Sequence, residues 1–335
     1  MRRVTIRDVA REAGVSVTTV SVVLNNSDRP VRDELRARVI EVAERLNYHP
    51  SALARSLVRQ KSNTIGIVLG EVEEGILGNY YAAGVLAGVF ARAQRFGLDL
   101  HLFTMGWTGD RPAQRVMAQQ PDGVLVVAPS YHSPIAPDLQ SVGLPVVSIS
   151  TPGDKSIPFV DIDNIAGTRL ALQHLIDLGH TRIGHVIAGE TQYSVFARRD
   201  EFIRFLKEKN IPVREDWLIT RSFEPEVIRT TVKELLLRKD RPTALFCTND
   251  GLALQTLLAA SEAGVRVPEE LSVIGFDDFP SAVQLAPPLT TVRQPFQQVG
   301  AEAVELLLER MAGGTNLHRY IIPELIIRSS TASLP

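Results

Sequence analysis

The chain has 335 residues, of which 44% are hydrophobic and 22% charged, and its formal net charge at pH 7 is −2. This length exceeds a typical single domain, and the composition is that of packed globular units, which excludes a disordered or low-complexity protein. The single cysteine, Cys247, excludes an internal disulfide and lies in an apolar run, as a buried reduced thiol would. No apolar run forms a signal peptide or reaches membrane-spanning length, so we expect a cytoplasmic protein with no membrane partner.

Charge is divided unevenly along the chain. Residues 1–61 carry 12 Lys and Arg against 7 Asp and Glu, whereas the remainder is acidic. A basic segment on an acidic body suits contact with nucleic-acid phosphates at one end only. A solvated charged helical face would give the same count, so charge alone does not decide between these alternatives.

Residues 5–25 predict two short helices around a tight turn, which is the pattern of a DNA-reading helix-turn-helix. Thr5 and Asp8 have the spacing of a capping box, Gly14 ends the first helix, and Ser16 is expected to cap the second. The second helix turns an apolar face inward and small uncharged side chains outward, namely Val20, Val23 and Leu24 against Val17, Thr18, Ser21 and Val22. A third amphipathic helix around residues 35–46 completes a small headpiece.

The body alternates strands and helices from Asn63 onward, which predicts βαβ units and parallel sheets. One sheet seldom holds so many units, so two lobes are expected. The expected strands are 65–69, 98–103, 122–128, 145–149, 183–188, 244–248 and 271–276, and the expected helices are 80–96, 165–178, 196–209, 227–238 and 252–263.

The sequence contains no constellation of residues to which catalytic roles can be assigned. HExxH, GxSxG, P-loop and GxGxxG motifs are all missing, and the histidines form no metal-ligand pattern. Asp277 and Asp278 are adjacent at a strand end, where successive side chains point to opposite faces. We therefore expect neither an enzyme nor a cofactor.

With these features the chain resembles the LacI/GalR family of bacterial transcriptional regulators. Residues 47–57 are similar to the family's hinge helix and residues 64–68 to its first core strand. Five further segments follow in the family's order: 160–164, 178–183, 249–250, 273–278 and 288–292. The resemblance implies an N-terminal all-α helix-turn-helix headpiece plus an α/β two-lobed periplasmic-binding-protein-like core with parallel sheets.

The resemblance also implies the division of the chain and its partners. We expect a headpiece at 1–47, a hinge helix at 48–61 and an effector-binding and dimerisation core at 62–335. Within the core, the proximal lobe takes about 62–162 and 292–320, and the distal lobe about 163–291 and 321–333. The expected partners are operator DNA, a small-molecule effector and a second copy of the chain in a homodimer.

By resemblance, Val17, Thr18 and Val22 face base edges in the major groove. Val22 departs from the arginine or histidine that family members often carry, and it offers apolar contact such as that to a thymine methyl. A place in the helical core is the alternative for the two valines. Five residues are expected at phosphates: Thr5, Arg7, Ser16, Ser21 and Asn25. In the hinge, Ala54 and Leu57 are expected at DNA, with Leu57 matching the leucine that wedges into the minor groove; packing against the body is its alternative.

The resemblance places the effector between the lobes, at the carboxyl ends of strands. It implies that Arg198, Asn249 and Asp277 hydrogen-bond the effector and that Phe223 stacks on its ring. Further candidates are Tyr80, Tyr81 and Asp163, although Asp163 could instead cap a helix and Tyr81 could belong to the core.

These effector candidates favour a sugar, and the regulator is then expected to be a repressor of carbohydrate-utilisation genes. Phe223 also suits a flat purine, so a purine-responsive repressor is an alternative. A solute-binding protein is a further alternative, which the headpiece and the missing signal peptide oppose.

Overall fold

The computed structural model describes residues 4–25, 29–48, 61–70, 79–104, 107, 111–152, 156–189, 191–221, 224–316 and 318–334. The chain divides into two compact units, Met1–Thr64 and Ile65–Pro335. Three predicted site residues, Ala54, Leu57 and Phe223, lie outside the described residues.

The N-terminal unit contains the helices α1 (Ile6–Ala13), α2 (Val17–Leu24) and α3 (Asp33–Arg45). The Asp8 carboxylate accepts hydrogen bonds from the Thr5 N–H at 3.0 Å and the Thr5 hydroxyl at 2.7 Å, and Gly14 ends α1 with a φ of 65°. The Ser16 hydroxyl accepts from the Thr19 N–H at 3.0 Å at the start of α2. Both predicted caps are therefore confirmed. The three helices share one apolar core, formed by Val9, Ala10, Ala13, Val20, Val23, Val39, Val42 and Ala43.

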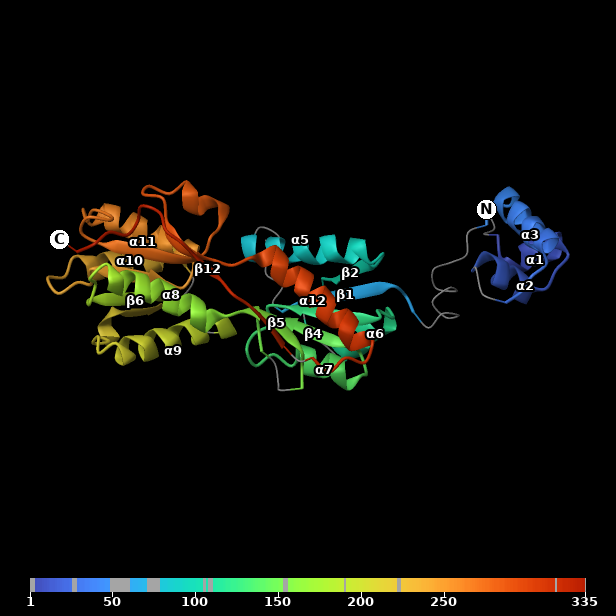
Figure 1. The fold of residues 1–335 in the computed structure, drawn as a ribbon, viewed down its shortest axis with the longest axis horizontal. Coiled ribbons are helices and arrows are strands. Elements are labelled where there is room, and N and C mark those ends of the chain that lie inside the picture. Colours follow the sequence, from blue (N-terminus) through green and yellow to red (C-terminus); the bar gives the residue numbers. More distant parts are fainter. Residues whose placement is uncertain are drawn as a thin grey trace. The chain divides into compact units, whose positions relative to one another are not determined.

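The C-terminal unit holds two six-stranded sheets, each covered by helices on both faces (Figure 1). The first sheet has the strand order β11-β5-β4-β3-β1-β2, and we call it and its helices the first lobe. Helices α5 and α12 pack on each other and on one face of this sheet. Helices α6 and α7 pack on each other, and α7 contacts β3 and β4 on the other face. Its elements are β1 (Thr64–Leu69), α5 (Tyr80–Arg95), β2 (Asp99–Phe103), α6 (Pro112–Ala118), β3 (Gly123–Val127), α7 (Ile135–Ser141), β4 (Val146–Ile149), β5 (Phe159–Ile162), α12 (Phe296–Met311) and β11 (His318–Ile321).

The second sheet has the order β12-β10-β9-β8-β6-β7 and forms the second lobe with α8–α11. Its neighbouring strands run parallel except β12, which pairs with β10 antiparallel. Its elements are α8 (Asn164–Asp177), β6 (Ile183–Ala188), α9 (Tyr193–Glu208), η2 (Glu215–Trp217), β7 (Leu218–Arg221), α10 (Pro225–Leu236), β8 (Ala244–Cys247), α11 (Asp250–Glu262), β9 (Ser272–Asp277), η3 (Pro280–Val283), β10 (Thr290–Arg293) and β12 (Glu324–Ile326).

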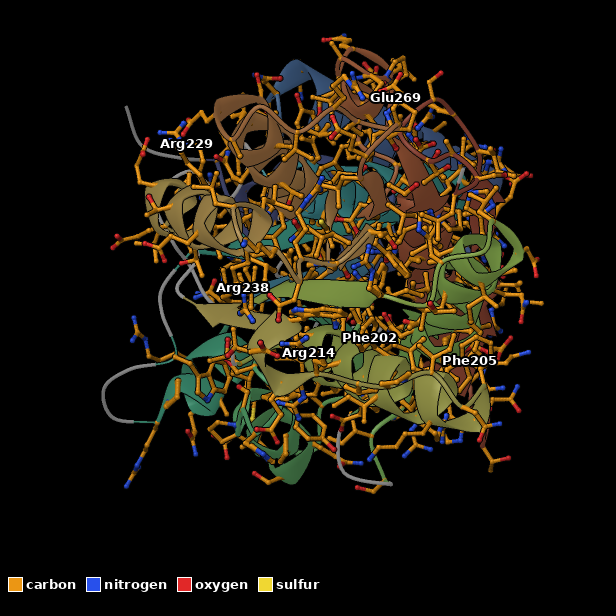
Figure 2. All side chains as sticks on the ribbon, turned by 90° about the vertical axis from the view of Figure 1, so that its left-hand side faces the viewer. Phe202, Phe205, Arg214, Arg229, Arg238 and Glu269 are labelled. Carbon is orange, nitrogen blue, oxygen red and sulfur yellow. The ribbon has the colours of Figure 1, made fainter. Side chains whose placement is uncertain are left out.

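Near β7, Arg214 and Arg238 lie close together on the surface (Figure 2). Each arginine bonds both Asp216 and Asp240, at distances of 2.6 to 3.0 Å. The four charges neutralise one another, so this cluster ties η2 to the segment after α10 and leaves no net charge for a ligand.

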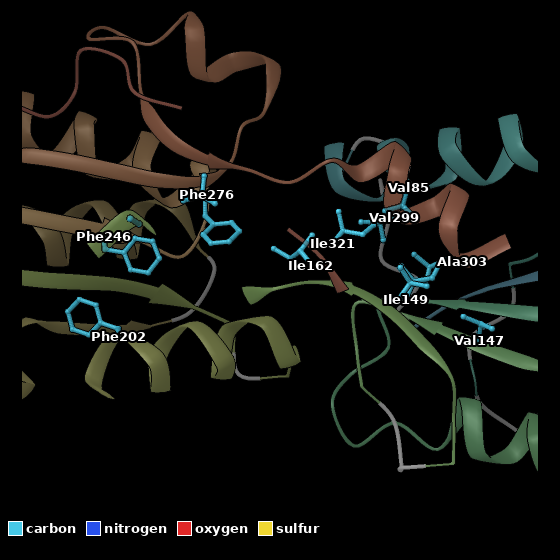
Figure 3. Close-up of a cluster of buried hydrophobic side chains, with 14 of the residues drawn as sticks. Val85, Val147, Ile149, Ile162, Phe202, Phe246, Phe276, Val299, Ala303 and Ile321 are labelled. Atoms are coloured by element: carbon cyan, nitrogen blue, oxygen red, sulfur yellow. The ribbon is translucent and has the colours of Figure 1, made fainter. Parts of the chain in front are cut away.

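The chain passes between the lobes at three places within the described residues: between β5 and α8, between β10 and α12, and between β11 and β12. Apolar packing continues through these crossovers. Ile162 and Ile321 are register partners in adjacent strands and lie between Phe276 of the second lobe and Val299 of the first (Figure 3). One hydrophobic core therefore extends from the first lobe into the second through the strands at the crossovers.

Several boundaries differ from the sequence expectation, among them that of α10, which is Pro225–Leu236 rather than 227–238. Helix α9 begins at Tyr193, ahead of the expected residue 196. This start could not be predicted, because the preceding Gln192 does not cap the helix with its side chain and gives no sequence signal. Val292 and Arg293 pair with β9 in the second lobe, although the expected division placed them in the first. Conversely, Ile321 belongs to β11 of the first lobe, although the same division placed it in the second. Among the described residues, no helix is both long and apolar enough to cross a bilayer.

Candidate functional site

A cavity of about 700 Å³ lies between the two lobes. Its walls come from the carboxyl ends of strands in both sheets, such as Leu69 and Val127 in the first lobe and Thr248 and Asp277 in the second. Ligands of open α/β sheets bind at this end of the strands. We call this cavity the cleft.

Three non-glycine residues with positive φ line the cleft at strand ends. Ala128 follows β3 with a φ of 45°, Ser150 follows β4 with a φ of 63°, and Asp277 ends β9 with a φ of 117°. Such backbone conformations cost energy for residues with a Cβ and are concentrated at functional sites. The strained strand ends are therefore consistent with a binding site in the cleft.

Among the described residues that line the cleft, Arg198 of α9 is the cation, and it is only 4% exposed. Its Nε donates to Asn164 Oδ1 at 2.9 Å and its Nη1 to the Thr248 carbonyl at 2.6 Å, while its Cζ lies 3.5 Å from the centroid of the Phe276 ring. Burial lowers its pKa, and the nearby Asp277 opposes this effect. No described residue accepts a hydrogen bond from its Nη2, which leaves donors for a ligand.

Two buried carboxylates accompany this guanidinium. Asp277 Oδ1 lies 3.8 Å from Arg198 Nη1 and accepts a hydrogen bond from the Gln294 amide. Asp161 of β5 accepts from the Ile162 N–H at 2.8 Å and the Asn164 amide at 2.9 Å. Burial raises the pKa of each carboxyl to about 7, although Arg198 acts to lower both. Burial therefore makes each of these carboxyl groups easier to protonate than an exposed one.

Aromatic side chains also line the cleft, beside aliphatic residues such as Ile228 and Leu252. The Tyr81 hydroxyl bonds the Ser150 hydroxyl, and burial raises the pKa of Tyr81 well above its usual value. The Tyr80 ring lies 5.4 Å from the ring of Phe279, which belongs to the second lobe. The cleft thus combines flat apolar faces with a few polar groups, as small-molecule sites do.

Five of the predicted effector residues line this one cleft: Tyr80, Tyr81, Arg198, Asn249 and Asp277. Asn249 also caps α11, because its Oδ1 accepts from the Leu252 N–H at 2.9 Å. Asp163 does not line the cleft. Its Oδ1 accepts from the Ala166 N–H at 2.8 Å, so it has the helix-capping role that the sequence offered as the alternative.

Sequence reasoning missed other residues of the cleft, among them Asp161, Gln192, Ser194, Phe279 and Gln294. Asp161 could have been found as a charge inside an apolar strand. Gln192 gave no such signal, since it precedes a helix that it does not cap. Its Oε1 is buried, and no described residue donates a hydrogen bond to it.

The N-terminal unit presents the predicted DNA-binding residues at its surface. Thr5, Arg7, Ser16 and Thr18 are exposed, and Val17 at the start of α2 is 41% exposed. Three others are partly exposed, namely Ser21, Val22 and Asn25. The inward face of α2 is filled by Val20 and Val23, which are 0% and 5% exposed.

A model of the lacI family of bacterial regulatory proteins matches residues 5–51, and a model of the periplasmic binding protein-like domain matches residues 172–331. The transcriptional repressor PurR of Mannheimia succiniciproducens is 37% identical over 337 residues, which cover 98% of this chain and 99% of that protein. The chain belongs to the LacI family. PurR of Aliivibrio salmonicida is 36% identical over 339 residues, with the same coverage.

Solved LacI-family structures agree over nearly the whole chain. The lac repressor dimer bound to operator and the anti-inducer ONPF matches with a TM-score of 0.85 and 26% identity, over 99% of this chain and 100% of that one. The complex of the regulator CelR with cellobiose matches with a TM-score of 0.74 and 29% identity, over 98% and 100%. The expected fold class is confirmed, and as a LacI-family member the protein is a DNA-binding transcriptional repressor.

Proposed function

We propose that this repressor responds to a purine that binds in the cleft. The observation that carries the proposal is that the buried Arg198 and Asp277 line one cleft together with the amide of Gln192 and three aromatic rings. Carboxylate and amide groups pair in plane with the edges of a heterocyclic base, and tyrosine or phenylalanine rings stack on its face. The names of the PurR relatives support a purine over the sugar that the sequence favoured.

A carbohydrate effector is the second candidate function. The CelR–cellobiose complex, whose fold this chain shares over 98% of its length, supports it. Charged and amide side chains with an aromatic face also bind vicinal hydroxyls and the apolar side of a pyranose. The two candidates therefore differ in the ligand and use the same cleft.

For DNA recognition, we propose that Val17, Thr18 and Val22, on the outward face of α2, contact the bases. Phosphate contacts are assigned to the hydroxyl, amide and guanidinium groups around the helix starts. We also propose that the chain acts as a homodimer divided into a headpiece, a hinge and a two-lobed core, because a dimeric lac repressor matches it along its full length. The hinge assignment, including Ala54 and Leu57, rests on the resemblance alone.

Calorimetry on the purified repressor tests the effector. Hypoxanthine, adenine and their nucleosides are titrated beside ribose, glucose and cellobiose, and the ligand that binds is then added to an operator-binding assay. The proposal expects a purine to bind and to change operator affinity. Binding by a sugar with no response to any purine would replace it by the second candidate.

A further inference from the structure

Asn164 is the first residue of α8, directly after the crossover from β5, and it is 4% exposed. Its side chain bonds two charged groups at once. Asn164 Oδ1 accepts from Arg198 Nε at 2.9 Å, and its Nδ2 donates to Asp161 Oδ2 at 2.9 Å. Asn164 itself is not part of the cleft wall, whereas both of its charged partners are.

The amide of Asn164 suits this position because it has one acceptor and one donor in a fixed plane. Arg198 requires an acceptor at Nε, and Asp161 requires a donor at Oδ2. A hydrophobic residue of the same size would leave a buried donor and a buried acceptor unpaired, which is costly in a low-dielectric interior. Because the amide is neutral, it bridges the Arg198 guanidinium and the Asp161 carboxyl without adding a charge of its own.

The bond to Asn164 determines which edge of the guanidinium faces the cleft. With Nε held by Asn164 and Nη1 by the Thr248 carbonyl, only Nη2 lacks an acceptor among the described residues. The guanidinium plane is held from a second direction by the Phe276 ring, 3.5 Å from Cζ. Arg198 is therefore oriented before any ligand arrives, which reduces the entropy lost on binding.

Asn164 also attaches this oriented arginine to the crossover. Asp161 and Ile162 belong to β5 of the first lobe, and Asn164 begins a helix of the second. At the next crossover Gln294, between β10 and α12, donates to Asp277 in the same way. The first crossover thus binds Arg198 through Asn164, and the second binds Asp277 through Gln294.

We propose that Asn164 is a positioning residue of the effector site, which orients Arg198 toward the ligand and ties it to the first interlobe crossover. This inference rests on the proposed function only in assuming that the cleft takes a small-molecule effector. It predicts that loss of the Asn164 amide weakens effector binding although Asn164 does not contact the effector.

Two variants separate positioning from general stability. Asn164→Leu keeps the side-chain size and removes the hydrogen bonds of the amide, whereas Asn164→Asp keeps an oxygen acceptor for Arg198 and keeps a bond to Asp161 when the two carboxyl groups share a proton. Thr168→Val is the matched control, since Thr168 is equally buried on α8 and its hydroxyl bonds the Asn164 carbonyl rather than Arg198. Thermal unfolding of each variant shows whether it is folded.

The first measurement needs no ligand. Hydrogen exchange of the Arg198 Nε–H is followed by nitrogen-edited NMR of the full chain, with the resonance assigned by its loss in Arg198→Lys. We expect slow exchange in the wild type, in Asn164→Asp and in Thr168→Val, and fast exchange in Asn164→Leu. Fast exchange in the wild type would overturn the inference even if Asn164→Leu did not fold.

The second measurement is calorimetric titration with hypoxanthine and adenine. We expect Asn164→Leu to raise the Kd at least tenfold, Asn164→Asp to recover much of this loss, and Thr168→Val to leave the Kd within twofold of the wild type. Equal affinity in Asn164→Leu and the wild type would overturn the positioning role. Absence of purine binding in the wild type would instead defeat the proposed function, and the exchange measurement would still decide the role of Asn164.

Discussion

Asp250 shows how a single buried charge makes stability depend on pH. It is the first residue of α11 and 3% exposed; one carboxylate oxygen accepts from the Thr291 hydroxyl at 2.6 Å and the other from the Phe279 N–H at 2.8 Å. Burial raises its pKa to about 8, and the charge of Asp277 adds to this. The carboxyl therefore fixes the segment that carries Phe279 into the cleft, and its burial opposes ionisation.

The folded state binds the Asp250 proton more tightly than the unfolded state, where the pKa is about 4. Its contribution to the free energy of unfolding is thus largest at low pH and is lost as the pH rises through about 8. We therefore compare the free energy of unfolding of Asp250→Asn with that of the wild type by urea unfolding. As the pH rises from 5.5 to 8.5, we expect the difference to shift in favour of the variant by at least about 1.4 kcal/mol, the equivalent of one pKa unit. The same substitution at the exposed Asp99 is the control. A parallel pH dependence of Asp250→Asn and the wild type would contradict this assignment.

Among the elements, the crossing of α5 and α12 shapes the cleft most directly. A Cβ on Gly88 would lie 1.9 Å from the Gln297 carbonyl oxygen, and one on Gly300 would lie 2.1 Å from the Val85 carbonyl oxygen. The two backbones therefore touch where the helices cross. Because α5 begins with Tyr80 and Tyr81 and α12 follows Gln294, this contact fixes the distance between two walls of the cleft.

Gly88→Ala tests this contact. Helix propensity alone would favour alanine by about 1 kcal/mol, but the new methyl group overlaps a backbone atom that cannot rotate away. We expect the free energy of unfolding to fall by about 1–3 kcal/mol in chemical denaturation. Ala87→Gly, at the neighbouring exposed position of α5, calibrates the propensity of the same helix. A stability equal to or above that of the wild type would show that the helices separate without cost.

At the scale of the whole molecule, the sequence predicts what depends on local periodicity. Capping at Thr5 and Ser16 and the strands β1–β4, β6, β8 and β9 follow from neighbouring residues, and so they could be predicted. The short strands β5, β7, β10, β11 and β12 are not among the expected strands. The contacts of Gly88 with α12 and of Asn164 with Arg198 join distant segments, and a lone glycine or asparagine in a helix gives no sign of such a partner. Asp163 shows the same limit, because a carboxylate at a strand end suits a ligand and a helix cap equally well.

The charges of the cleft lead to a prediction for the repressor as a whole. Asp161 and Asp277 belong to different lobes and both have a pKa of about 7, raised by burial. They are faced by Arg198 of α9 and Tyr81 of α5, with Asp250 and Tyr193 nearby. A ligand that donates N–H or O–H groups to these carboxylates favours their ionised forms, so binding should release a proton near neutral pH.

We therefore expect effector affinity to fall as the pH is lowered from 8 to 6, by up to about tenfold per pH unit for each proton released. Calorimetry in two buffers of different ionisation enthalpy counts the protons directly. Since effector and operator binding are reciprocally coupled, the effector should also change operator affinity less at pH 6 than at pH 8. Operator binding without effector, measured at both pH values, is the control for direct effects on the headpiece. Equal effector affinity at the two pH values, with no proton released, would mean that neither carboxylate changes its protonation when the ligand binds.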